Sequence, residues 1–326
     1  MQTVDFHTHL LSSELSFDRI YDKLAIKFFG EKMGLDKNMA LKSPYTAYTQ
    51  ALISNIKNSK YVSKSVIFGV DGRFDYSGTE MHRDKTVCAS NEDVLKLYKE
   101  NRDIFIPFFS INPMRHDALE LIDKYHALGF KGAKFLQNYW GVDTRDDKYL
   151  PYFEKLAKLN IPLIVHVGSE SSVLSDKSCE CIEMLDAPLK AGVKTVAAHM
   201  ALSYSPLRPI KAISKKPRNF GKEYHRLLAM LEMHDNLYAD ISALLTPVRA
   251  KALPHLASQK HIHHKLLFGT DYPVPFSAIF TSYDLPLSKR REIESEPNTL
   301  DRYTKAILEY FPKESEMYTN WQKLLT

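Results

Sequence analysis

The sequence predicts an α/β fold of the (β/α)8 TIM-barrel class, formed by a single domain over residues 1–326. Eight short β-rich segments alternate along the chain with segments of helical periodicity. These β-rich segments are almost continuously apolar, as strands buried on both faces are, and eight parallel strands close a barrel. A doubly wound open sheet would normally have a glycine-rich turn after its first strand, and no such turn follows Phe6.

The eight strands can be assigned from their apolar character and from the turn residues that bound them. In chain order they are residues 3–6, 65–70, 104–109, 132–136, 161–165, 195–198, 237–241 and 265–269. Helices are expected between them, and residues 118–128 place apolar side chains on one helical face. Ser90 with Asp93, and Thr144 with Asp147, resemble capping boxes with Asp in place of the usual Glu. We therefore expect helices to begin at both places.

Two segments are longer than the connections of a simple barrel. Residues from about 11 to 60 follow the first strand, and residues 203–221, rich in Pro, Lys and Ser, follow the sixth. Both would lie at the C-terminal mouth of the barrel, where long loops often form lids or specificity elements. We expect a lid-like insertion at about 11–60. A peripheral element that packs helices or contacts another copy of the chain is an equally weighted alternative.

The composition excludes several classes of protein. The chain has 44 Lys and Arg against 39 Asp and Glu, a net charge of +5, and its basic residues are mostly scattered, so we expect no nucleic-acid partner. Three cysteines without framework spacing argue against a disulfide scaffold and fit a reducing compartment. Residues 1–10 lack the pattern of a signal peptide, and no apolar stretch approaches the length of a membrane helix. We therefore expect a cytoplasmic protein with no membrane partner, and leave a homo-oligomer open.

The strongest chemical signal is the pair His7 and His9 at the end of the first strand. Residues two apart in a strand point to the same side, so both imidazoles can project together toward the barrel axis. Two converging neutral nitrogens make half of a zinc-like site. An H-x-H pattern alone is weak, but this one directly follows an apolar strand.

Three further residues occupy the same topological position. His166, His199 and Asp271 each follow an apolar run, at the ends of the fifth, sixth and eighth predicted strands. Any one of these residues alone is more often a buried, hydrogen-bonded side chain or a cap. Catalytic groups of such barrels come from the C-terminal ends of different strands, so the shared position favours a joint metal site.

Five motifs in order make the sequence resemble the amidohydrolase-related family, over roughly residues 1–290. The family includes aminocarboxymuconate-semialdehyde decarboxylase and related metal-dependent hydrolases and decarboxylases. The motifs are V-D-F-H-T-H, F-I-P-F-F-S-I-N-P, G-F-K-G-A-K, I-P-L-I-V-H-V-G and L-L-F-G-T-D-Y-P. Residues 320–325 also resemble the closing helix of this family.

The resemblance implies a ligand set and a cofactor. His7, His9, His166 and Asp271 would hold a divalent metal, most simply one Zn²⁺ per chain, and His199 would lie beside it as a polarising or proton-transfer group. Asp271 would also accept a proton from the attacking water. A second metal is left open by Lys134, which stands near the position of the carboxylated lysine that bridges two metals in binuclear amidohydrolases.

The implied reaction is hydrolysis of an amide, ester or lactone bond of a small molecule by water made nucleophilic by the metal. Non-oxidative decarboxylation of a small unsaturated or aromatic acid is the alternative. A barrel that binds a metal or ligand without turnover is the second alternative, which the intact set of five candidate residues disfavours.

A small anionic substrate is expected because basic residues follow several strands. Lys134, Arg73 and Arg145 are candidates for gripping a carboxylate, and Arg208 and Lys211 follow the sixth strand. Trp140 is a candidate aromatic wall of the binding site, although core packing explains it equally well.

Overall fold

The computed structural model describes residues 2–15, 30–169, 173–203, 220–247, 249–282 and 284–325. Its main sheet has eight parallel strands in the order β1-β2-β5-β6-β7-β8-β9-β10. All eight strands predicted from the sequence are confirmed. They are β1 (Thr3–His9), β2 (Val62–Phe68), β5 (Phe105–Phe109), β6 (Gly132–Phe135), β7 (Leu163–Val165), β8 (Thr195–Ala197), β9 (Leu237–Asp240) and β10 (Leu266–Leu267).

Backbone hydrogen bonds between the first strand and the segment after the last one close the ring. Phe6 N donates to Phe268 O at 2.9 Å, and His9 N donates to Tyr272 O at 2.9 Å. Between them, Asp271 N donates to His7 O at 2.9 Å. The barrel of the prediction is therefore confirmed, and its closure brings Asp271 beside the first strand.

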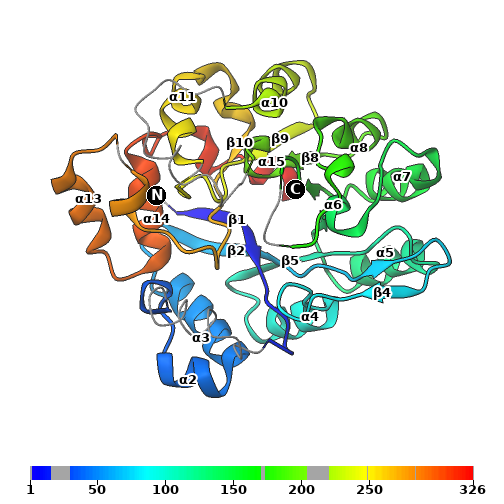
Figure 1. Cartoon of the computed structure of the whole chain (residues 1–326), viewed down its shortest axis with the longest axis horizontal. Coiled ribbons are helices and arrows are strands. Elements are labelled where there is room, and N and C mark those ends of the chain that lie inside the picture. Colours follow the sequence, from blue (N-terminus) through cyan, green and yellow to red (C-terminus); the bar gives the residue numbers. More distant parts are fainter. Residues whose placement is uncertain are drawn as a thin grey trace.

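Helices surround the strands, as Figure 1 shows. They are α2 (Lys37–Lys42), α3 (Pro44–Lys57), α4 (Asn91–Glu100), α5 (Ala118–Ala127), α6 (Gln137–Trp140), α7 (Leu150–Lys158), α8 (Asp186–Lys190), α10 (Lys222–Met233), α11 (Leu253–Ser258), α12 (Ala278–Thr281), α13 (Leu287–Glu294), α14 (Thr299–Leu308) and α15 (Gln322–Leu325). In the described part of the chain, no helix is both long enough and apolar enough to cross a membrane.

One of the two predicted capping boxes is confirmed. Ser90 caps α4: its hydroxyl accepts from Asp93 N, and the Asp93 carboxylate accepts from Ser90 N. The box at Thr144 is wrong, because the Thr144 hydroxyl donates to Met184 O at 3.0 Å instead. Asp146 caps the short 3-10 helix Asp147–Tyr149 in its place.

The inside of the barrel is a separate apolar core with a closed N-terminal end. Alternate strand residues such as Val4, Phe6 and Phe108 fill it. The C-terminal segment seals this end, since Leu324 packs into the inner core and Asn320 Nδ2 donates to Leu266 O at 2.8 Å. The opposite, C-terminal mouth is the end at which barrels of this class carry their active sites.

The lid-like insertion predicted at about 11–60 is not confirmed by the described residues. Its second half contains α2 and α3, and α3 leads into β2 as the crossover helix of the first βα unit (Figure 1). The preceding residues 30–36 pack against the barrel, because Tyr272 Oη donates to Met33 O at 3.1 Å and Thr299 Oγ1 to Lys32 O at 2.6 Å. Residues 16–29 lie outside the described part of the chain, as do residues 204–219 of the second long segment.

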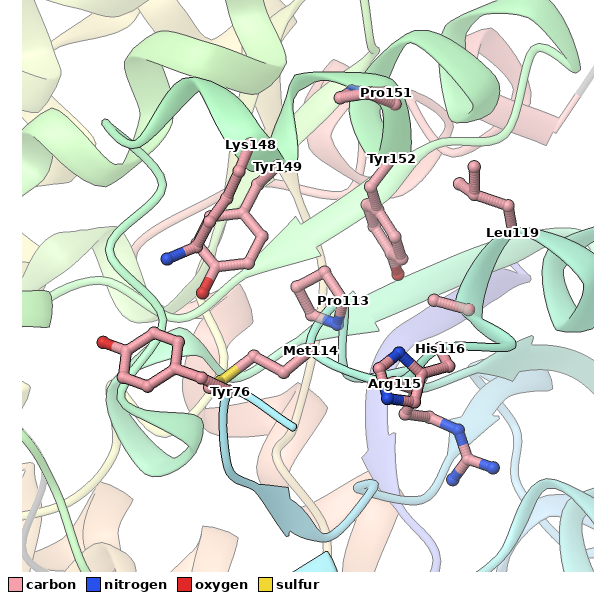
Figure 2. Close-up of a pocket in the computed structure, with 11 residues that line it drawn as sticks. Tyr76, Pro113, Met114, Arg115, His116, Leu119, Lys148, Tyr149, Pro151 and Tyr152 are labelled. Atoms are coloured by element: carbon pink, nitrogen blue, oxygen red, sulfur yellow. The ribbon is translucent and has the colours of Figure 1, made fainter. Parts of the chain in front are cut away.

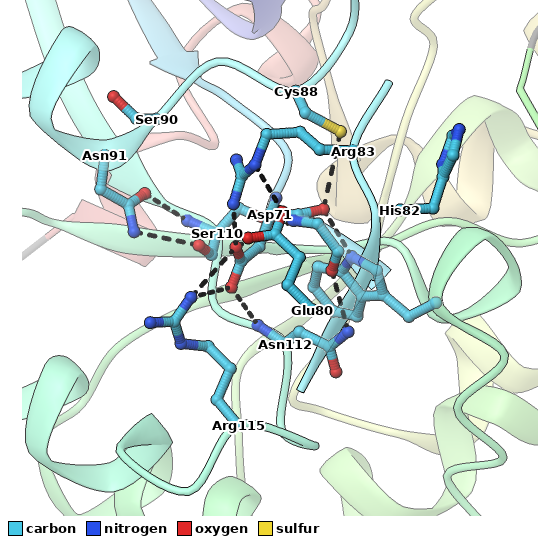
Figure 3. Close-up of polar contacts among 12 residues, drawn as sticks. Asp71, Glu80, His82, Arg83, Cys88, Ser90, Asn91, Ser110, Asn112 and Arg115 are labelled. Carbon is cyan, nitrogen blue, oxygen red and sulfur yellow. Dashed lines mark hydrogen bonds and ion pairs between the residues drawn. The ribbon is translucent and has the colours of Figure 1, made fainter. Parts of the chain in front are cut away.

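A hairpin that the sequence did not predict follows β2. It consists of β3 (Arg73–Phe74) and β4 (Glu80–His82). The buried Asp71 carboxylate anchors its base by accepting from Asn112 N at 3.0 Å and from both Arg83 and Arg115, as Figure 3 shows. This network ties together the loops that follow β2 and β5 at the mouth of the barrel.

Candidate metal centre

A bulge in β1 aims both histidines of the H-x-H pattern into the mouth. Asp5 pairs with Ser65 of β2 and Thr8 with Ile67, so β1 has one residue more than its partner between these pairs. Phe6 already faces the inner core, and in a regular strand His7 would then point outward. The extra residue removes this conflict. The Asp5 carboxylate stabilises the bulge, because it accepts from His7 N at 3.2 Å.

Three side chains converge at the C-terminal ends of β1 and β10. His7 Nε2 and His9 Nε2 each lie 3.4 Å from Asp271 Oδ1. The side chain of His7 is fully buried, whereas that of His9 is 19% exposed, so the group opens toward solvent on the side of His9. The rings of His7 and His9 are 5.3 Å apart and both contact the Phe68 ring.

The other two histidines, His166 and His199, lie at the same end of the barrel. The His199 ring lies 4.9 Å from the His7 ring and 5.3 Å from the His166 ring. His166, which follows β7, lines one cavity together with His9, His199 and Asp271. The structure thus brings together all five residues that the sequence singled out at strand ends.

A carboxylate that the sequence analysis missed orients two of these rings. Asp240, the fully buried last residue of β9, accepts from His7 Nδ1 at 2.7 Å through Oδ2. Its Oδ1 accepts from His199 N at 3.0 Å, from Ser242 N at 3.1 Å and from the Ser242 hydroxyl. Both oxygens are engaged, so Asp240 positions its neighbours and His7 keeps its lone pair on Nε2.

The hydrogen bonds of His199 define its tautomer as well. Its Nδ1 lies 3.1 Å from Ser242 O and 2.8 Å from Ser242 Oγ. The carbonyl can only accept, and the Ser242 hydroxyl already donates to Asp240, so His199 Nδ1 carries the proton. The Nε2 atom of His199 therefore has a lone pair that can accept a proton or hold a cation.

Burial keeps both of these imidazoles neutral. It lowers the pKa of His7 well below 6.5, and the charge of Lys134 lowers it further. Burial likewise lowers the pKa of His199 well below 6.5, followed by the charge of Arg249. Neutral imidazole is the form that binds metals.

Strained backbone gathers around the same strand ends. Among the described non-glycine residues, six have a positive φ, and five of these follow β8, β9 or β10; the five are His199, Met200, Ala201, Ala243 and Asp271. L-residues adopt this region at a cost of about 1–2 kcal/mol each, and such residues cluster at functional sites. Two of the five convergent residues, His199 and Asp271, themselves have this strained backbone.

The geometry suits a divalent cation. With zinc–ligand distances of about 2.0–2.1 Å, neighbouring ligand atoms of a tetrahedral site lie ~3.4 Å apart. The separations of Asp271 Oδ1 from His7 Nε2 and from His9 Nε2 match this edge length. These three residues also form a group whose ligand atoms lie within 4.8 Å of one another. Imidazole nitrogens with one carboxylate oxygen are a donor set typical of zinc.

Comparison with known proteins gives the family. A profile described as amidohydrolase matches residues 4–291. The chain belongs to the amidohydrolase family. No match is found among the curated proteins.

Several solved structures resemble this amidohydrolase in fold at low sequence identity. A probable 2-pyrone-4,6-dicarboxylic acid hydrolase from Acinetobacter baumannii, with citric acid bound, is 13% identical, with a TM-score of 0.56, and the match covers 100% of this chain and 99% of that chain. The Metarhizium anisopliae IDCase in apo form is 14% identical, with a TM-score of 0.55, covering 99% and 97%. An amidohydrolase from Burkholderia multivorans with bound zinc is 14% identical, with a TM-score of 0.51, covering 100% and 96%.

Lys134 lies beside one of the convergent histidines. Its side chain is fully buried on β6, and Nζ lies 3.4 Å from His7 Nε2 and 5.2 Å from the centre of the Phe68 ring. It therefore contacts a candidate ligand directly.

The other residues expected to bind substrate do not line this cavity. Arg145 is half exposed and forms a two-point ion pair with Asp143, with Nη2–Oδ2 at 2.6 Å and Nε–Oδ1 at 2.7 Å. Trp140 is buried, and its indole Nε1 donates to Asp71 O at 2.9 Å, so it packs against the loop that follows β2. Arg73 begins β3, beside Gly141. Arg208 and Lys211 lie outside the described residues.

The molecule has a larger cavity that lies away from the convergent histidines (Figure 2). Its volume is about 390 Å³, and its walls come from the β3–β4 hairpin, the loop after β5 and the start of α7. Tyrosine rings, Arg115 and Lys148 line it, but none of the five convergent residues does. The larger cavity and the convergent histidines therefore lie at different places on the molecule.

Proposed function

We propose that this chain is a metal-dependent hydrolase that cleaves an amide, ester or lactone bond of a small molecule. His7, His9, His166 and Asp271 would hold one divalent cation, most simply zinc. The observation that carries the proposal is the convergence of the His7 and His9 imidazoles on Asp271 Oδ1, both at 3.4 Å, at the C-terminal mouth of the barrel. A divalent cation in such a site acts as a Lewis acid and makes water nucleophilic at neutral pH.

The residues of the chain would supply the proton transfers and the positioning. Asp271 can accept a proton from the attacking water, since its carboxylate lies beside both candidate imidazole ligands. His199 presents the Nε2 lone pair toward the mouth, and can accept a proton there and return it to the leaving group. The Asp240 carboxylate fixes His7 and the loop of His199 in the required orientation.

Lys134 favours one metal in this proposal. Its Nζ is 3.4 Å from the His7 nitrogen that would bind the cation, and an ammonium has no lone pair with which to ligate a second cation. We propose that Lys134 is not carboxylated and that its positive charge favours a negatively charged group of the substrate at the metal.

Decarboxylation remains the second candidate. The cavity above the candidate ligands has mainly apolar walls, which suits an unsaturated or aromatic acid as well as an ester or lactone. Product analysis separates the two, because decarboxylation releases carbon dioxide and hydrolysis does not.

The test is a screen of esters, lactones, amides and aromatic acids with the zinc-loaded protein, with a chelator and with zinc restored. We expect turnover that a chelator abolishes and zinc recovers. His264→Ala is a matched control for His7→Ala, because His264 is exposed at the N-terminal end of the barrel. Turnover that survives both chelation and His7→Ala would contradict the proposal.

A further inference from the structure

The cavity at the strand ends has two chemically different sides. Its floor consists of His9, His166, His199 and Asp271. Its wall is apolar and is formed by Leu11, Val87, Leu136, Val173, Pro273 and Val274. A molecule that fills this space therefore meets metal-binding groups at one end and hydrocarbon over the rest of its surface.

The apolar wall is assembled from separate βα loops and is held by the core. Leu136 follows β6 and is only 4% exposed. Leu11, Val87 and Val173 come from the loops after β1, β2 and β7, and all three pack against the main hydrophobic core. Side chains packed in this way keep a defined shape, so the wall is preformed.

The positively charged side chains near the cavity do not contribute to its apolar wall. No Arg or Lys is among the described residues that line the cavity. Lys134 is fully buried beside His7, and the buried Arg249 donates from Nε to Leu202 O at 3.0 Å. A second carboxylate on a substrate would therefore have to leave water and lie against hydrocarbon, which is strongly unfavourable.

The volume of the cavity indicates how large a group its wall can cover. Its volume is about 150 Å³. An apolar cavity of roughly this volume holds a benzene molecule. The space therefore fits one six-membered ring or a compact branched chain.

We infer that the substrate joins one polar reacting group to a compact, uncharged, apolar body of about the size of a benzene ring. Val87, Leu136 and Val173 are then residues that determine specificity, because they contact the body and exclude charged ones. This inference deepens the proposed function and rests on it. The sequence predicts a small anionic substrate, and under this inference the single negative charge lies at the reacting end.

Hydroxamates that share a metal-binding head and differ in their bodies test the inference without knowledge of the reaction. Calorimetry with the zinc-loaded protein would compare acetohydroxamate, benzohydroxamate and the monohydroxamate of succinic acid. We expect benzohydroxamate to bind at least about tenfold more tightly than acetohydroxamate, since its ring is buried against the wall. The succinic compound should bind no more tightly than acetohydroxamate. A preference for the succinic compound, or equal binding of all three, would overturn the inference.

Substitutions in two different loops show where the body binds. Val173→Asp and Val87→Asp should each weaken benzohydroxamate about tenfold and change acetohydroxamate less than about twofold. Leu174→Asp is the matched control, because Leu174 is the next residue, is 58% exposed and does not line the cavity. Thermal unfolding identifies a variant that fails to fold. If one of the two variants does not fold, the affinity of the other variant tests the inference. Unchanged affinity for benzohydroxamate in the folded variants would overturn the inference.

The same titrations distinguish the inference from the proposed function. If acetohydroxamate binds only when zinc is present but a ring gives no advantage, the metal centre stands and the inference about the body is wrong. If acetohydroxamate does not bind the zinc-loaded protein, the proposed metal centre is wrong and the inference fails with it.

Discussion

Replacing Asp240 by asparagine tests how one buried carboxylate positions two histidines. Oδ2 of Asp240 accepts from His7 Nδ1 at 2.7 Å, and Oδ1 accepts from His199 N and from two donors of Ser242. An asparagine side chain has only one acceptor oxygen, so its NH2 group must face one of these sets of donors. If it faces His7, the proton of that ring moves to Nε2 and removes the lone pair that would bind the metal.

The expected magnitude follows from this change. Loss of the hydrogen-bond partner of a metal-ligating histidine typically lowers metal affinity 10- to 100-fold, which is about 1.4–2.7 kcal/mol. Because Asp240 is fully buried, a donor left without an acceptor should also lower the free energy of unfolding by about 1–3 kcal/mol.

Zinc affinity, measured by competition with a chromogenic chelator, is the assay. Asp235→Asn is the matched control, because Asp235 is exposed just before the same strand. Asp240→Asn should bind zinc at least about tenfold more weakly than this control. If both variants bind zinc as tightly as the unmodified chain, Asp240 does not orient a ligand and the reasoning is refuted.

Four other outcomes are expected. His199→Asn should keep its zinc while turnover falls about 10²- to 10⁴-fold, and loss of zinc together with activity would make His199 a ligand. The free energy of unfolding of the metal-free protein should fall as the pH drops below 6.5, because the pKa values of His7 and His199 are lowered in the folded state and the unfolded chain binds more protons. Asp5, whose pKa burial raises to about 6, should offset part of this fall below pH 6, and a urea titration series that shows no fall would refute the assignment. Gly269→Ala should weaken zinc binding, because the added Cβ would lie 3.0 Å from His7 Cβ and displace that ring. Unchanged zinc affinity would show that the backbone after β10 moves to accommodate the methyl group. A high-resolution crystal structure of the zinc-loaded protein should show no carboxyl group on Lys134, and a bridging carboxyl between two metals would refute the single-metal site.

The strands and the histidine positions could be predicted because their causes are local in the sequence. A strand buried on both faces must be apolar, and a parallel barrel presents its catalytic groups at the C-terminal strand ends. Leu163–Val165 followed by His166, and Thr195–Ala197 followed two residues later by His199, express both rules within a few residues. The family resemblance rests on the same short segments.

Features that depend on distant partners could not be predicted in this way. The bulge in β1 depends on Asp5, which also accepts from Thr270 N at 2.9 Å across the barrel closure. The sequence pattern does not show whether a basic side chain already forms an ion pair with a neighbouring residue, as Arg145 does with Asp143. Asp240, by contrast, ends the seventh strand, so the rule applied to the other strand ends would have identified it.

The metal content of purified protein, compared with that of His7→Ala and His264→Ala, tests the central claim most directly. His7 has a fully buried side chain, and its Nε2 lies 3.4 Å from Asp271 Oδ1. His264 is an exposed histidine at the other end of the barrel. We expect one zinc per chain in the unmodified protein and in His264→Ala, and little or none in folded His7→Ala after dialysis. Zinc that remains at one per chain in His7→Ala would contradict the proposed metal centre.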